Sequence, residues 1–138
     1  MDIQEIKHLF FAYRNGVVAD VLRRSGMPYK MIFGVDVPSI TEIARRIGYD
    51  NELAEKLWSE TDVRESRILA TYLFDPACVS IDKARRLVSE VRTREEADML
   101  VFRLIRKLDY ANSLIDELKD KEEFARAAEA LERDMTQS

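Results

Sequence analysis

Two stretches of the sequence decide the fold: DVRESRILATYL at residues 62–73 and TREEADMLVFRL at residues 93–104. Each begins with a capping box, Asp62–Glu65 or Thr93–Glu96, in which the first side chain accepts an unpaired backbone N–H and the glutamate reaches back to the cap residue. The boxes are offset by 31 residues, and apolar residues match at the same offset. The matched pairs are Ile68 with Met99, Leu69 with Leu100, Ala70 with Val101, and Leu73 with Leu104. The stretches therefore predict two equivalent helices.

A second helix precedes each of these stretches, at residues 50–60 and 81–91. Two similar helical hairpins in succession are typical of a repeat array, because each hairpin leaves an apolar face that a neighbour has to cover. We therefore expect an all-α fold of stacked antiparallel helical hairpins, a HEAT-like α-solenoid.

The flanking sequence extends this pattern in both directions. Apolar spacing predicts helices over 3–14 and 17–24, then a proline-bounded loop over 27–38, and then a helix from Pro38 to Ile47. In that loop we expect Tyr29, Met31, Ile32 and Phe33 to close the end of the core.

The repeat signal weakens after Asp109. Residues 110–118 and 122–135 are expected to form a third, degenerate pair. The expected organisation is one domain over 1–138, with N-terminal helices and loop at 1–48, two hairpins at 49–108 and capping helices at 109–138.

Composition supports a small helical protein. Of the 138 residues, 46% are hydrophobic and 35% charged, and four glycines with three prolines are too few for a many-stranded β fold. The first residues do not have the pattern of a signal peptide, and no apolar run is long enough to cross a bilayer. The single cysteine is typical of a protein from a reducing compartment. We expect a cytoplasmic protein.

Charge is distributed unevenly along the chain. The formal net charge is −4, but residues 64–107 carry 10 basic and 7 acidic side chains, whereas residues 108–138 carry 4 basic and 9 acidic. A mildly basic middle is compatible with a phosphate-facing surface, and equally with solvated helix faces.

Few residues indicate chemistry by themselves. His8 is expected to be an ordinary helix histidine, Cys78 a small buried residue, and Trp58 a packing residue between helices rather than a base-stacking one. One histidine and one cysteine are too few for a metal site, and no glycine-rich phosphate loop is present. No metal or cofactor is expected.

Asp98 is the most informative carboxylate, because it lies at the edge of its helix's apolar stripe. At the 31-residue offset its counterpart is Arg67. If the two helices stack in register, these side chains share one groove. The alternatives are an ion pair, to Arg67 across the helices or to Arg94 one turn back, and a functional role.

Three segments together resemble the bacterial DNA alkylation repair glycosylases, a HEAT-like family that excises alkylated purines. They are FGVDVPSITEIA at 33–44, LAEKLW at 53–58 with the following Arg64-Glu65 and apolar run to Leu73, and REEAD at 94–98. The resemblance covers about residues 29–108. It places Asp98 on the family's catalytic aspartate, whereas Arg94 stands where the family has a tryptophan.

The resemblance implies that Asp98 would stabilise the positive charge that develops on the sugar as the base leaves. Against typical members we expect the chain to be short of the downstream repeats that supply more of the DNA-facing groove, and so to bind DNA without efficient base excision. Under this hypothesis double-stranded DNA is the partner, and the expected phosphate contacts are Arg64, Arg67, Arg94, Arg103 and Arg106. The alternative is a non-catalytic helical adaptor that binds a protein partner or a second copy of itself.

Overall fold

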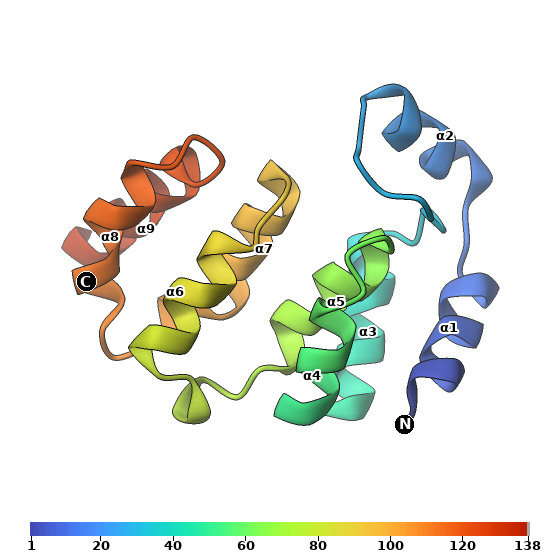
Figure 1. Ribbon diagram of the computed structural model, residues 1–138, viewed down its shortest axis with the longest axis horizontal. Helices are drawn as coiled ribbons and strands as arrows, with labels where there is room; N and C mark the ends of the chain where they lie inside the picture. Colours follow the sequence, from blue (N-terminus) through green and yellow to red (C-terminus); the bar gives the residue numbers. More distant parts are fainter. Residues whose placement is uncertain (138) are drawn as a thin grey trace. The chain divides into compact units, whose positions relative to one another are not determined.

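The computed structural model describes residues 1–137, which are helical apart from loops and one isolated parallel bridge between Met31 and Val63. The chain forms two compact units, residues 1–74 and a second unit that begins at Asp75. The first unit contains α1 (Ile3–Ala12), α2 (Gly16–Arg24), α3 (Val37–Ile47), α4 (Asn51–Trp58) and α5 (Arg64–Leu73). The second contains the 3-10 turns η1 (Pro76–Cys78) and η2 (Ile105–Lys107), with α6 (Ile81–Ser89), α7 (Arg94–Arg103), α8 (Ala111–Lys119) and α9 (Ala125–Gln137) (Figure 1).

The first unit is built around α5, which packs against both α3 and α4. Nine of the ten residues of α5 are buried, including Ile68, Leu69 and Leu73 with no exposed surface. Trp58, at the end of α4, is 2% exposed, which confirms that it packs between helices. The apolar stripe predicted over 62–73 is therefore the core of this unit.

The loop between α2 and α3 is held against α5 by a buried carboxylate. Glu65, with no exposed surface, accepts hydrogen bonds from the backbone N–H of Phe33 (3.0 Å) and of Gly34 (3.1 Å). Gly34 has a φ of +78°, and a Cβ there would lie 2.2 Å from the carbonyl oxygen of Asn15. Only glycine fits that position without displacing the start of α2.

The expectation that this loop closes the core is partly wrong. Tyr29 and Ile32 are buried in a separate small cluster with Ala19 of α2, whereas Met31 is 48% exposed. Met31 instead pairs through its backbone, donating to the carbonyl of Asp62 (2.9 Å). Its side chain is consequently turned outward.

One of the two predicted capping boxes is wrong. The N-cap of α5 is Val63, whose hydrocarbon side chain cannot accept a hydrogen bond. Glu65 accepts from the loop instead of reaching back to the cap. The second box forms: Thr93 Oγ1 accepts the N–H of Glu96 (3.1 Å), and Glu96 Oε1 accepts the N–H of Arg92 (3.0 Å). Glu96, at N3, thus serves the cap of α7, whereas Glu65, at N2 of α5, binds a distant loop.

The second unit confirms the predicted third helical pair. Helices α4, α6 and α8 begin at Asn51, Ile81 and Ala111, at a constant spacing of 30 residues. Within the unit, α9 packs against α7 and α8. Phe124, Ala128 and Leu131 form the buried stripe expected for the last helix. Helix α7 ends at Arg103 and gives way to η2, although Leu104 and Leu108 are both buried.

The repeat period also appears in the hydrogen bonds within each unit. In the first unit the hydroxyls of Thr41 and Tyr72, 31 residues apart, are 2.7 Å from each other. In the second unit the Tyr110 hydroxyl donates to the carbonyl of Val79 (2.6 Å), again across 31 residues. Tyrosine side chains thus join successive helical pairs at a fixed offset.

The structure also bears on the cysteine, the domain organisation and the absence of a membrane span. Cys78 lies in η1 and is exposed, so the prediction of a buried cysteine is wrong. The single domain over 1–138 stays a prediction, and the boundary between the two compact units falls between the two matching hairpins. Among residues 1–137 no helix is both long and apolar enough to cross a membrane.

Candidate nucleic-acid interface

Two of the five predicted phosphate-contacting arginines are buried. Arg64 is 3% exposed, and its Nη1 donates to the carbonyl of Val35 (3.1 Å) and to Glu65 Oε2 (2.8 Å). Its charge is thereby neutralised inside the first unit. This burial does not fit a contact with phosphate, for which a guanidinium must reach the surface, and it corrects the expected role to a structural one.

Arg67 is also directed inward. It is 1% exposed, its Nη1 donates to the carbonyl of Trp58 (2.6 Å), and its guanidinium lies over the Trp58 ring at 3.6 Å from the centroid. A cation stacked on an aromatic ring and bonded to a backbone carbonyl is a packing element. Arg67 therefore has a structural role in place of the expected phosphate contact. Because Arg67 and Asp98 belong to different units, their sharing of a groove stays a prediction.

Asp98 lies on α7, with its side chain 35% exposed. Its nearest charged partner is Arg126 of α9, whose Nη2 is 3.8 Å from Asp98 Oδ2. Neither of the two partners expected from the sequence takes this place, although Arg94, one turn earlier on α7, contributes a favourable charge. The carboxylate is therefore accessible to solvent and is flanked by arginines from two helices.

The surroundings of Asp98 raise the pKa of its carboxyl overall. Partial burial raises the pKa of its carboxyl above the ordinary value, and Glu95 acts in the same direction. The positive charges of Arg126 and Arg94 oppose that rise. Any anion that competes for these two arginines would leave Asp98 with less compensation, so the three groups form one coupled site.

Arg126 is the residue that sequence reasoning missed. It falls in the acidic C-terminal segment, which suggested a solvated capping helix, and nothing local marks it. Its side chain is 71% exposed while its guanidinium approaches Asp98 from the neighbouring helix. The only available signal was the packing of a third helical pair against the second, which places α9 beside α7.

The remaining predicted arginines lie at both ends of α7. Arg94 begins the helix and is exposed, whereas Arg103 ends it and is half-buried. Nine residues at 1.5 Å each separate them by about 13 Å along the helix axis. Arg106, in η2, is exposed. Arg94, Asp98 and Arg126 thus form the candidate site, and Arg103 and Arg106 lie further along the same unit.

Comparison with solved structures defines the class of this chain as a HEAT-like helical-repeat protein. One solved structure, described as belonging to a new family of proteins related to the HEAT-like repeat DNA glycosylases with affinity for branched DNA structures, matches with a TM-score of 0.80 at 19% sequence identity. The match covers 93% of this chain and 55% of the other, so this chain spans about half the length of that structure. At this identity the likeness shows the fold.

The family follows from the sequence. The family model described as DNA alkylation repair enzyme matches residues 6–133, nearly the whole chain. The chain therefore belongs to the DNA alkylation repair enzyme family, as its resemblance over residues 29–108 indicated. A search of curated proteins gave no match.

Proposed function

We propose that this chain binds DNA through its second unit, with Arg94 and Arg126 contacting phosphates on either side of Asp98. The observation that carries the proposal is the position of Asp98: it is one-third exposed and lies between two exposed arginines from α7 and α9. Guanidinium groups bind phosphate oxygens bidentately, and a phosphate between them would take the place of Asp98 as their partner. Arg103 and Arg106 would extend the contact along the backbone.

Branched DNA is the first substrate to test, because the similar solved structure is described as having affinity for it. A contact made through phosphates reads DNA shape and backbone position more than base identity. Such binding would be strongly salt-dependent and tolerant of sequence. The proposal places the protein in the cytoplasm, where an exposed thiol such as that of Cys78 stays reduced.

Base excision is a separate and weaker part of the proposal. A glycosylase needs an ionised carboxylate close to the sugar as positive charge develops there, and Asp98 is the candidate. The raised pKa of its carboxyl works against ionisation, and Arg126 and Arg94 work for it. Because partial burial makes the Asp98 carboxylate harder to ionise, we expect DNA binding without efficient base excision.

The adaptor function is the second candidate, favoured by the burial of Arg64 and Arg67. Two of the five arginines expected on a DNA-facing groove are internal. A protein partner would then bind the helical surface instead of DNA, and no base release would be seen.

Binding to four-way-junction DNA and to a linear duplex of the same composition, measured by fluorescence anisotropy at several salt concentrations, separates these functions. Arg94→Gln and Arg126→Gln should each weaken binding about tenfold, roughly 1.4 kcal/mol, and reduce the salt slope by about one. The matched control is Arg45→Gln, an exposed arginine of α3 in the first unit. Binding that is absent in the wild type, or equally unaffected by all three variants, would contradict the proposal.

Release of alkylated base from methylated DNA tests catalysis independently, with Asp98→Asn as the variant. Removing the negative charge beside bound phosphate should tighten DNA binding while abolishing any base release. Wild-type release no higher than that of Asp98→Asn would end the excision hypothesis and leave the binding proposal intact.

A further inference from the structure

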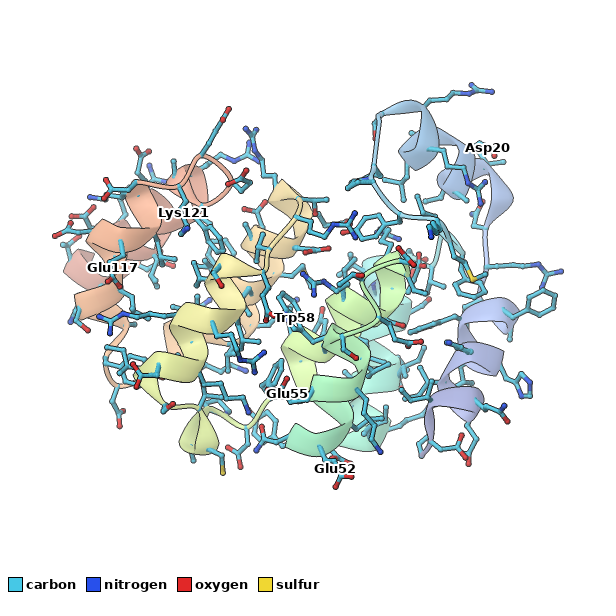
Figure 2. All side chains as sticks on the ribbon, viewed as in Figure 1. Asp20, Glu52, Glu55, Trp58, Glu117 and Lys121 are labelled. Carbon is cyan, nitrogen blue, oxygen red and sulfur yellow. The ribbon has the colours of Figure 1, made fainter. Side chains whose placement is uncertain are left out.

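The outer face of α2 is apolar and has no cover within the part of the chain that the structure describes. Val17 and Val21, one helical turn apart, are 75% and 59% exposed, and Arg24 continues the same stripe. The opposite face of the helix is already used, because Ala19 and Leu22 pack with Tyr29 and Ile32. Figure 2 shows Asp20 projecting outward from this helix.

An exposed aromatic residue lies just before this stripe. Phe11, in the last turn of α1, is 56% exposed, and the guanidinium of Arg14 lies 3.8 Å from its ring centroid. Asp20 is engaged by Arg23 at 3.3 Å. We name Phe11, Arg14, Val17, Val21 and Arg24 the N-terminal surface; it is apolar and positively charged.

The other end of the chain has a surface of opposite character. A cleft of about 510 Å³ lies between α8 and α9, with Ile115 and Met135 as its apolar lining. Asp116 and Glu132 contribute carboxylates to the same cleft. Lys119 is paired with Glu132 and its charge also reaches Asp116, but Asp116 is the more exposed of the two carboxylates. The segment from Leu108 onward carries 9 acidic and 4 basic residues.

We infer that the N-terminal surface of one molecule docks in the α8–α9 cleft of a second copy of this chain. Val17 and Val21 would enter beside Ile115 and Met135, and Arg24 would approach Asp116. Apolar residues meet apolar residues and a basic rim meets an acidic one, which is the complementarity that selects an orientation. The association is independent of the DNA-binding proposal.

The geometry of such a contact has a distinctive consequence. The two surfaces differ, so the contact is head-to-tail, and a single contact leaves one molecule with a free head and the other with a free tail. Wild-type protein should therefore form assemblies that grow with its concentration. Added salt should weaken the association by screening the arginine–carboxylate contacts.

Complementary variants test this inference in DNA-free buffer by sedimentation velocity. The head variant is Val21→Gln with Arg24→Gln, and the tail variant is Asp116→Arg, so the two altered surfaces gain no new charge attraction for each other. All three sites are exposed, so folding should persist, and circular dichroism checks it. Each variant should weaken association at least tenfold. The matched control, Glu52→Lys, changes a side chain that is 84% exposed on α4 (Figure 2) and should associate like the wild type.

Mixing the two variants gives the decisive result. The intact tail of the head variant can bind the intact head of the tail variant, so the mixture should form a two-chain complex that grows no further. A wild type that remains a single chain at every concentration would overturn the inference. So would variants that associate as strongly as the wild type, or a mixture that forms no complex.

Discussion

Replacing Glu65 with glutamine should destabilise the first unit severely. The carboxylate has no exposed surface and serves three donors: the N–H groups of Phe33 and Gly34 and the Nη1 of Arg64. Removing one partner of a buried ion pair costs about 3–5 kcal/mol, because the remaining charge is left uncompensated. Glutamine retains one acceptor oxygen but turns its amide N–H₂ toward backbone donors. We therefore expect a loss of about 3 kcal/mol.

Urea unfolding followed by the fluorescence of Trp58 measures this loss. The chain has one tryptophan, it is 2% exposed, and it lies in the same unit as Glu65. With a urea dependence of about 2 kcal/mol/M, the midpoint should fall by roughly 1.5 M. The matched control is Glu52→Gln on the exposed face of α4, which should change stability by less than about 0.5 kcal/mol.

A double variant distinguishes the cause. If the stranded Arg64 charge is the main cost, Arg64→Met in the Glu65→Gln background should restore part of the stability, so the two changes would be strongly non-additive. A loss below about 1 kcal/mol for Glu65→Gln would refute the reasoning. Simple additivity of the two substitutions would also refute it, since it would show that the carboxylate and the guanidinium act separately.

Three further substitutions probe other contacts. Gly34→Ala should destabilise by about 2 kcal/mol or more in the same unfolding assay, because the new Cβ would meet the Asn15 carbonyl at a positive φ; a neutral result would mean that the loop is free to move. Arg67→Lys should cost about 1–2 kcal/mol and change Trp58 emission, since lysine cannot reproduce the planar stack; unchanged emission would contradict the stacking. Asp98→Asn should stabilise the fold slightly at pH 7: the folded-state pKa of Asp98 is raised, so its ionised form opposes folding above that pKa, and thermal unfolding should show the advantage vanish as the pH falls toward 4. A variant that is less stable at pH 7 would reverse that interpretation.

The fold could be predicted from the sequence because its signals are local or periodic. The 31-residue offset between the two apolar stripes anticipated both hairpins, and the third pair was expected over residues 110–118 and 122–135. The misassigned cap at Asp62–Glu65 has a specific reason: a glutamate at N3 fits a capping box, but here a loop 31 residues earlier offers two backbone donors. Such long-range competition leaves no mark in the local pattern.

The candidate site was predicted less well, for an electrostatic reason. From the sequence alone, every arginine was expected to place its charge at the surface. The guanidinium groups of Arg64 and Arg67 instead bind Glu65, Trp58 and backbone carbonyls inside the first unit. Arg126 was overlooked because its neighbours are acidic. Packing between helices decides which charged side chains reach solvent. The sequence pattern does not show how the helices pack.

The narrowness of the buried stripe on α6 has an evolutionary consequence. In α6 only Ala84, Leu87 and Val88 are buried, so most of its nine positions tolerate any residue that is compatible with a helix. A lineage can exchange these solvent-side residues freely while the backbone keeps its course. This tolerance accounts for a similar structure at 19% identity, and it means that binding preferences can diverge within the family faster than architecture does.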